Sequence, residues 1–218
     1  MKKIFTFWGV IVFVIMLTPM FFSSCETEED TKVPEPISTF FSAVIGGNNK
    51  SIKPGTNGYL IQPYDTCFTD TAGTHYTAGI RLFQSNSGYY VSSREEFKIE
   101  LVNLLDADGV NKDSLFHAYL SQPALPWYNP NQVADSTKHT GMCIKWRTAN
   151  GNWYTTSKAS QSTEISVDST KNVTLPGGIS THEVYLKFTC TLYEKGGTKT
   201  LTLIEGRGRF SFLNTSFF

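Results

Sequence analysis

Hydrophobic and polar residues alternate along several segments of the chain. The clearest segment is 183–194, where one face consists of Val184, Leu186, Phe188, Cys190 and Leu192. Residues 96–104 and 141–148 show the same period of two. Side chains alternate between the two faces of a strand, so this pattern predicts strands that are half buried.

Other segments are rich in β-branched and aromatic residues and are bounded by turn residues. Together they predict about ten strands, at residues 38–45, 50–53, 59–62, 74–84, 96–104, 141–148, 153–154, 164–167, 183–194 and 201–213. Pro63 is expected to end the third of these, and Gly79 to mark a bulge in the fourth. Asn150-Gly151 is a strong hairpin signal, and Gly206 and Gly208 are expected to bend the last strand.

One short helix is predicted at residues 113–120, with Asp113 as its cap and an apolar stripe of Leu115, Phe116 and Tyr119. The next segment, 122–132, contains three prolines and is predicted to be a loop. The resulting fold class is all-β: an antiparallel β-sandwich with one short helix, with a lipocalin-like barrel as the alternative.

The N-terminus is organised differently from the rest of the chain. Lys2 and Lys3 precede residues 4–22, which carry no charge, and the apolar run stops at Phe22-Ser23-Ser24-Cys25. A transmembrane helix is one interpretation of such a run, and a cleaved signal peptide is the other. The Phe-Ser-Ser-Cys sequence resembles the lipobox of bacterial lipoproteins. That resemblance implies cleavage before Cys25 and acylation of its thiol.

Four acidic residues follow the cysteine, at positions 26, 28, 29 and 30. The cluster resembles the export signal of Bacteroidota lipoproteins, which implies a lipid-anchored protein on the exterior face of the outer membrane. The opening FSAVIGG and the closing EGRGRFSF are similar to small β-sandwich domains of such lipoproteins. The expected organisation is a signal peptide at 1–24, a lipidated and acidic tether at 25–36, and one domain at 37–218.

Charge and cysteine content narrow the function classes. The chain has 19 basic and 19 acidic residues, and removing Lys2 and Lys3 with the signal peptide would leave a net charge of about −2. No basic run stands out, so nucleic acid is not an expected partner.

With Cys25 assigned to the lipid anchor, the domain has three cysteines: Cys67, Cys143 and Cys190. Either Cys143 and Cys190 form one disulfide, or all three are buried thiols.

Trp127-Tyr128 is the most prominent candidate binding site. Pro126 and Pro130 flank the pair and would stiffen the loop, so that flat rings could stack on a ligand. The alternative is that Trp127 fills a small core beneath its own loop.

Asp106, Asp108 and Gly109 resemble part of a calcium loop, but leucines fall at the first and twelfth positions, where oxygen ligands are needed. We expect no metal and no cofactor.

Three functional hypotheses follow from these patterns. The leading one is a non-catalytic surface lipoprotein that binds a glycan or a protein. The second is a glycan-directed hydrolase, which would need two carboxylates facing one cleft. The third is a structural or adhesive component of a surface assembly that joins its partners through strand edges.

Overall fold

Antiparallel pairing between segments that follow one another in the chain produces most of the fold. The computed structural model describes residues 39–84, 94–130, 139–174 and 180–213. The predicted signal peptide, the tether and the lipidation site Cys25 lie outside the described residues. Among the described residues, no helix is both long enough and apolar enough to cross a bilayer.

Eleven strands and one helix make up the described chain. The strands are β1 (Phe40–Ile45), β2 (Asn48–Ile52), β3 (Tyr59–Asp70), β4 (Gly73–Gln84), β5 (Glu96–Asp106), β6 (Ala124–Leu125), β7 (Gly141–Arg147), β8 (Trp153–Thr155), β9 (Ile165–Thr174), β10 (Ser180–Glu194) and β11 (Thr200–Leu213). The helix is α2 (Lys112–Leu120). The predicted class, all-β with one short helix, is therefore confirmed.

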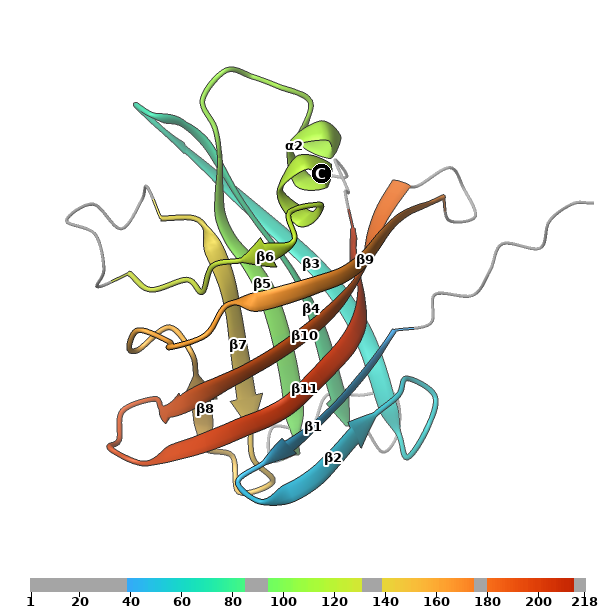
Figure 1. The fold of residues 1–218 in the computed structure, drawn as a ribbon, viewed down its shortest axis with the longest axis vertical. Coiled ribbons are helices and arrows are strands. Elements are labelled where there is room, and N and C mark those ends of the chain that lie inside the picture. The colour runs from blue at the N-terminus through green and yellow to red at the C-terminus, as the bar shows by residue number, and fades with distance from the viewer. Residues whose placement is uncertain (1–38, 85–93, 131–138, 175–179, 214–218) are drawn as a thin grey trace, which may run out of the picture. The chain divides into compact units, whose positions relative to one another are not determined.

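The strands belong to one hydrogen-bonded sheet that curls into a half-barrel. Its order is β2-β1-β11-β10-β8-β7-β5-β4-β3, and β9 pairs with both β10 and β6 beside this path. In Figure 1, β3, β4, β5 and β7 lie behind β10 and β11 and cross them at an angle. The curled sheet therefore packs one part of itself against another, as the layers of a sandwich do.

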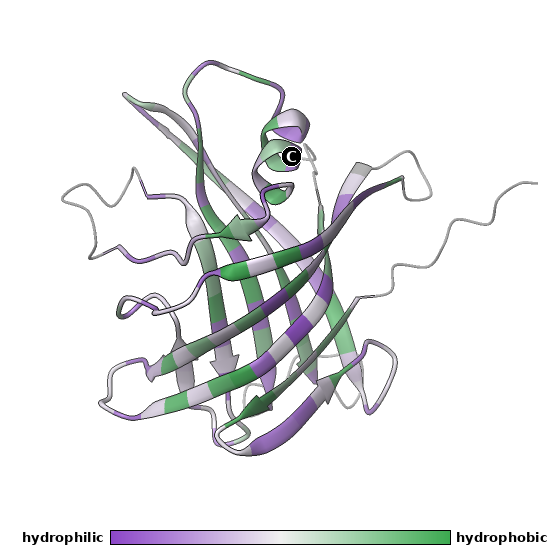
Figure 2. Ribbon diagram, in the orientation of Figure 1, coloured by the Kyte–Doolittle hydropathy of each residue, from purple (hydrophilic) through white to green (hydrophobic). Residues whose placement is uncertain are grey.

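The hydrophobic core lies on the concave side of the sheet. Figure 2 shows hydrophobic and hydrophilic residues alternating along the long strands. The predicted inner faces are fully buried on β5, at Phe97, Ile99 and Leu101, and nearly so on β10. Phe41 stacks on Phe97 with ring centroids 3.7 Å apart. We call the opposite, convex side of the sheet the outer face.

Three irregularities interrupt the register of the described sheet, one of them in β9 opposite Tyr185 and Leu186. Thr77 of β4 faces both Val102 and Asn103 on β5, and Asn103 adopts a positive φ of 63°. The second irregularity is in β11 at Glu205, which also has a positive φ and directly precedes Gly206. The irregularity predicted near Gly206 is thus present. The bulge predicted at Gly79 is wrong, because Gly79 pairs in regular register on both sides.

Three local predictions are corrected by the structure. The third strand does not stop at Pro63; β3 continues to Asp70 because it is an edge strand, where a missing N–H breaks no ladder on the outer side. The helix begins one residue earlier than predicted, and its cap is Asn111, whose side chain accepts from the Asp113 N–H. The loop at 122–132 contains the short strand β6.

The cysteines form no disulfide in the described chain. Cys143 and Cys190 are free and buried, whereas Cys67 is free and exposed near the end of β3. Of the two alternatives, the Cys143–Cys190 bridge is therefore absent. The alternative of buried thiols holds for these two residues but not for Cys67.

Candidate functional site

The structure places Trp127 inside the core. Its side chain is 6% exposed, its ring lies edge-on to Phe188 with centroids 6.2 Å apart, and its backbone bridges to Met142. Tyr128 is half-buried and lies near His139. The two rings form no exposed platform in this structure. The placement of Trp127 agrees with the second interpretation of the pair, a ring packed beneath its loop.

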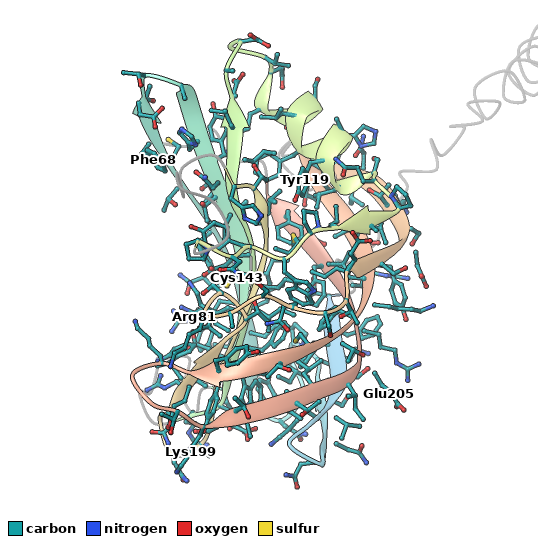
Figure 3. The ribbon with its side chains drawn as sticks, turned by 60° about the vertical axis from the view of Figure 1, so that its left-hand side comes forward. Phe68, Arg81, Tyr119, Cys143, Lys199 and Glu205 are labelled. Carbon is teal, nitrogen blue, oxygen red and sulfur yellow. The ribbon has the colours of Figure 1, made fainter. Side chains whose placement is uncertain are left out.

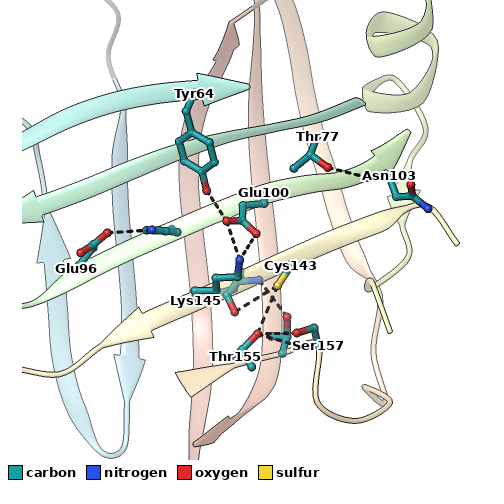
Figure 4. Close-up of polar contacts among 12 residues, drawn as sticks. Tyr64, Thr77, Glu96, Glu100, Asn103, Cys143, Lys145, Thr155 and Ser157 are labelled. Atoms are coloured by element: carbon teal, nitrogen blue, oxygen red, sulfur yellow. Dashed lines mark hydrogen bonds and ion pairs between the residues drawn. The ribbon is translucent and has the colours of Figure 1, made fainter. Parts of the chain in front are cut away.

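A polar network occupies the outer face where five strands meet. Its centre is Glu100 on β5, which receives hydrogen bonds from Tyr64 on β3 and from Lys145 on β7 (Figure 4). The Lys145 Nζ lies 2.7 Å from the second carboxylate oxygen. These residues align because Gly79, Glu100 and Cys143 pair across β4, β5 and β7.

Gly79 makes the contact between Tyr64 and Glu100 sterically allowed. A Cβ on Gly79 would lie 2.6 Å from Tyr64 Cζ and 3.0 Å from Glu100 Cγ. Both distances are too short for ordinary packing. The glycine therefore provides the space in which the Tyr64 ring crosses β4 to reach β5.

A second carboxylate on the same face holds three cations. The side chain of Glu96 is 1% exposed and lies 2.6 Å from Arg81 Nε, 3.4 Å from Lys98 Nζ and 3.6 Å from Arg147 Nη1. A buried carboxylate is tolerated only where such partners replace its water. Glu96 and Glu100 thus fix the positions of the basic side chains around them.

The pKa values of Tyr64, Cys143 and Lys145 in this network are all raised above their usual values. Burial raises the pKa of the Cys143 thiol, with a further contribution from the charge of Glu100. Burial and Glu100 also raise the pKa of Tyr64 strongly. The pKa of Lys145 is raised because its charge and hydrogen-bond interactions with Glu100 outweigh the opposing effect of burial. A nucleophilic thiol or amine would need a lowered pKa.

A cavity of about 470 Å³ opens beside this network. We call it the lysine cavity. It is lined by Lys98, Lys145, Trp153, Tyr154, Thr155, Ser157, Lys158, Lys195 and Gly196. The lining contains four lysines and no acidic residue. Trp153 is half-buried, and Lys98 Nζ lies 5.1 Å from the centroid of its ring.

The wall of the lysine cavity is held by backbone and side-chain hydrogen bonds. Trp153 pairs with Arg147 across β7 and β8. The Lys195 N–H donates to the Trp153 carbonyl at 2.7 Å, which fixes the β10–β11 turn against β8. Lys158 Nζ donates to the carbonyls of Glu194 and Gly197. The site therefore lies on paired strands and a pinned turn rather than on a free loop.

A larger cavity of about 780 Å³ lies along β1, β10 and β11. Its lining has both signs of charge, with Lys50, Lys187 and Arg207 beside Glu164 and Glu205. Lys50 pairs with Glu95 and Lys187 with Asp168, each at 2.5 Å. Unlike the lysine cavity, this one has carboxylates in its own lining. Neither a tryptophan nor a tyrosine lines this cavity, so the lysine cavity is the better candidate site.

The other sequence candidates do not converge on a site in the described part of the chain. There, no three His, Cys, Asp or Glu side chains meet in a way that could hold a metal ion. Asp106 of the calcium-like segment accepts the backbone N–H of Val110 and shapes the turn before α2. The adjacent carboxylates of Glu95 and Glu96 have different partners: Glu95 pairs with Lys50 and Glu96 with Arg81.

The fold and the site define a class: a curled antiparallel sheet with a basic cavity on its outer face. Comparison with protein-family models, with curated proteins and with solved structures found no match to this chain.

Sequence reasoning missed the lysine cavity although it located the strands. The outward positions of Lys98, Lys145 and Arg147 were readable from the alternation. Their convergence with Trp153 and Lys195 depends on the register of β5, β7, β8 and β10, which are far apart in the chain. Each strand contributes only one or two of these residues, so no single segment of the sequence indicates the group.

Proposed function

We propose that this chain is a surface-displayed lipoprotein of the Bacteroidota type whose β domain binds a glycan or a protein ligand without catalysing a reaction. The lipobox-like sequence ending at Cys25 and the acidic residues after it support the lipid anchor and the outer-membrane address. Membrane attachment would come from the lipid. The observation that carries ligand binding is the lysine cavity, with the half-buried ring of Trp153 in its wall.

The arrangement of the lysine cavity suits binding. Binding sites combine a concave surface with an aromatic ring and a few convergent polar groups. Here the ring is Trp153, and Thr155 and Ser157 add hydroxyl groups at the same surface. The paired strands beneath keep these groups in position, which reduces the entropy that a ligand must overcome.

The hydrolase alternative receives less support from the outer face. Glu96 and Glu100 are the buried carboxylates nearest the lysine cavity, and both are engaged by basic side chains.

The assembly alternative has one supporting observation. β3 pairs with β4 alone among the described strands, and residues 66–70 of β3 are exposed. Pro63 and the Asp65–Lys112 ion pair on the same strand are features that discourage edge-to-edge pairing.

The test is a glycan array together with protein pull-downs, performed with the whole chain in detergent and with Trp153→Ala. Loss of the aromatic contact is expected to weaken ligand binding by about tenfold or more. Trp153→Phe retains a flat ring and serves as the matched control, which should keep most of the affinity. Thermal melting of each variant separates loss of the site from loss of the fold. Ligand binding that is unchanged in Trp153→Ala would show that this cavity is not the site.

A further inference from the structure

The lysine cavity carries an excess of positive charge that the rest of the chain does not share. Four lysines line it, and no acidic residue does. Two of them, Lys98 and Lys145, pair with the carboxylates of Glu96 and Glu100, which lie outside the lining. The chain as a whole has equal numbers of basic and acidic residues, so the charge is concentrated locally.

The carboxylates lie behind or beside the cavity rather than in its lining. Glu96 and Glu100 are buried in the sheet, where they pair with Lys98 and Lys145. The carboxyl group of Glu194 lies against Gly197, where an added Cβ would overlap it. The surface that meets a ligand is therefore formed by ammonium groups, hydroxyl groups and an indole ring.

From this charge distribution we infer that the lysine cavity takes an anionic glycan, one that carries carboxylate or sulfate groups. The inference rests on the proposed binding function and specifies its ligand class. Ammonium groups bind carboxylate and sulfate oxygens through charge-assisted hydrogen bonds. The Trp153 ring, with Lys98 and Arg147 beside it, supplies an aromatic face on which the C–H groups of a sugar ring stack. The combination favours a sugar acid over an acidic peptide, which would need the charge but not the ring.

Lys195 is the side chain whose removal tests the charge most directly. It is exposed, it lines the lysine cavity, and it lies on the turn that follows β10. Lys199 is the matched control: it is also exposed, lies on the same β10–β11 turn, and does not line the cavity. Figure 3 shows Lys199 at the end of the molecule formed by this turn. The two substitutions remove the same charge from neighbouring positions.

The experiment measures binding of the whole chain in detergent to four immobilised probes. These are a short oligogalacturonate, its methyl ester, a sulfated oligosaccharide, and a polyglutamate of similar charge. The acidic glycans are expected to bind more tightly than the neutral ester and the polyglutamate, and the difference should shrink between about 50 and 300 mM salt. Lys195→Ala should weaken acidic-glycan binding roughly three- to fivefold, as an exposed ion pair does. Lys199→Ala should leave it unchanged.

Each contrary outcome has a distinct meaning. Equal binding of the acid and its methyl ester, with both lost in Trp153→Ala, would overturn the anionic inference and keep the binding function. Polyglutamate that binds as tightly as the glycans would assign the cavity to acidic peptides and overturn the glycan inference. Equal losses in Lys195→Ala and Lys199→Ala would show general charge attraction rather than a site. Absence of binding to any probe would count against both proposals.

Discussion

Gly79 should determine whether Tyr64 can reach Glu100, and the substitution Gly79→Ala tests this. The added methyl group would lie 2.6 Å from Tyr64 Cζ and 2.7 Å from its hydroxyl oxygen. These atoms are at the far end of a side chain, so the ring is expected to swing away while the backbone of β4 stays in place. Glu100 would then lose the Tyr64 hydrogen bond and retain Lys145.

The magnitude follows from two opposing terms. A hydrogen bond to a charged group contributes about 1.5–3 kcal/mol, and the partial exposure of Tyr64 places this one in the lower half of that range. Replacing glycine by alanine restricts the unfolded chain and returns about 0.4–1 kcal/mol. The expected net loss for Gly79→Ala is therefore about 1 kcal/mol. With a typical urea dependence of about 2 kcal/mol per molar, the unfolding midpoint should fall by about 0.5 M.

A double-mutant cycle with Tyr64→Phe identifies the cause. Tyr64→Phe alone should cost about 1.5–2 kcal/mol, because the acceptor Glu100 is buried. In the Gly79→Ala background it should cost almost nothing, since that bond is already broken. Additive effects within about 0.5 kcal/mol would refute the coupling. A Gly79→Ala variant more stable than the original chain would refute the steric reasoning itself.

Four further predictions concern other parts of the molecule. Trp127→Ala should destabilise the domain by about 3–5 kcal/mol in urea unfolding, since it deletes a buried large aromatic. The folded Trp127→Ala variant should still bind the ligand of the lysine cavity. In native protein lacking the Cys25 thiol, a thiol reagent should modify Cys67 at once and the two buried cysteines only after unfolding; prompt labelling of more than one thiol would contradict their burial. Burial and the charge of Glu95 raise the pKa of Tyr59 to about 12, so its contribution to stability is complete below pH 10 and declines as pH rises toward 12; Tyr59→Phe should reduce that decline in alkaline melting curves. Cys25→Ala should abolish fatty-acid labelling of the chain, and labelling that persists would exclude the proposed anchor.

The fold class and most strands could be predicted because alternation is a local property of the sequence. Residues 183–194 alternate without interruption, and β10 indeed buries each of the predicted inward positions. Predictions failed where the partner of a strand decided the outcome. Pro63 is tolerated because β3 has a neighbour on one side only, and nothing near Pro63 in the sequence indicates that β3 is an edge.

The glycines and cysteines show the same limit. Gly79 was expected to mark a bulge, but it makes room for a ring that comes from β3, a contact set by strand register. Cys143 and Cys190 lie on strands whose alternation was read correctly, yet Cys143 takes the outer face and Cys190 the inner one. A disulfide needs side chains that point toward each other. The alternation within one strand shows which side chains share a face of the sheet. Whether side chains from two strands meet depends on how the sheet curls.

The two buried carboxylates link the stability of the sheet to the binding properties proposed for its outer face. Glu96 and Glu100 hold Lys98 and Lys145 in fixed positions, so these ammonium groups can meet a ligand with little loss of side-chain entropy. The same pairing weakens their attraction for an anion, because part of each charge is already balanced. Lys195 has the opposite properties: it is exposed and must be ordered by the ligand. Lys195 is therefore expected to add charge attraction for an anion, whereas Lys98 and Lys145 are expected to set the geometry of the bound ligand.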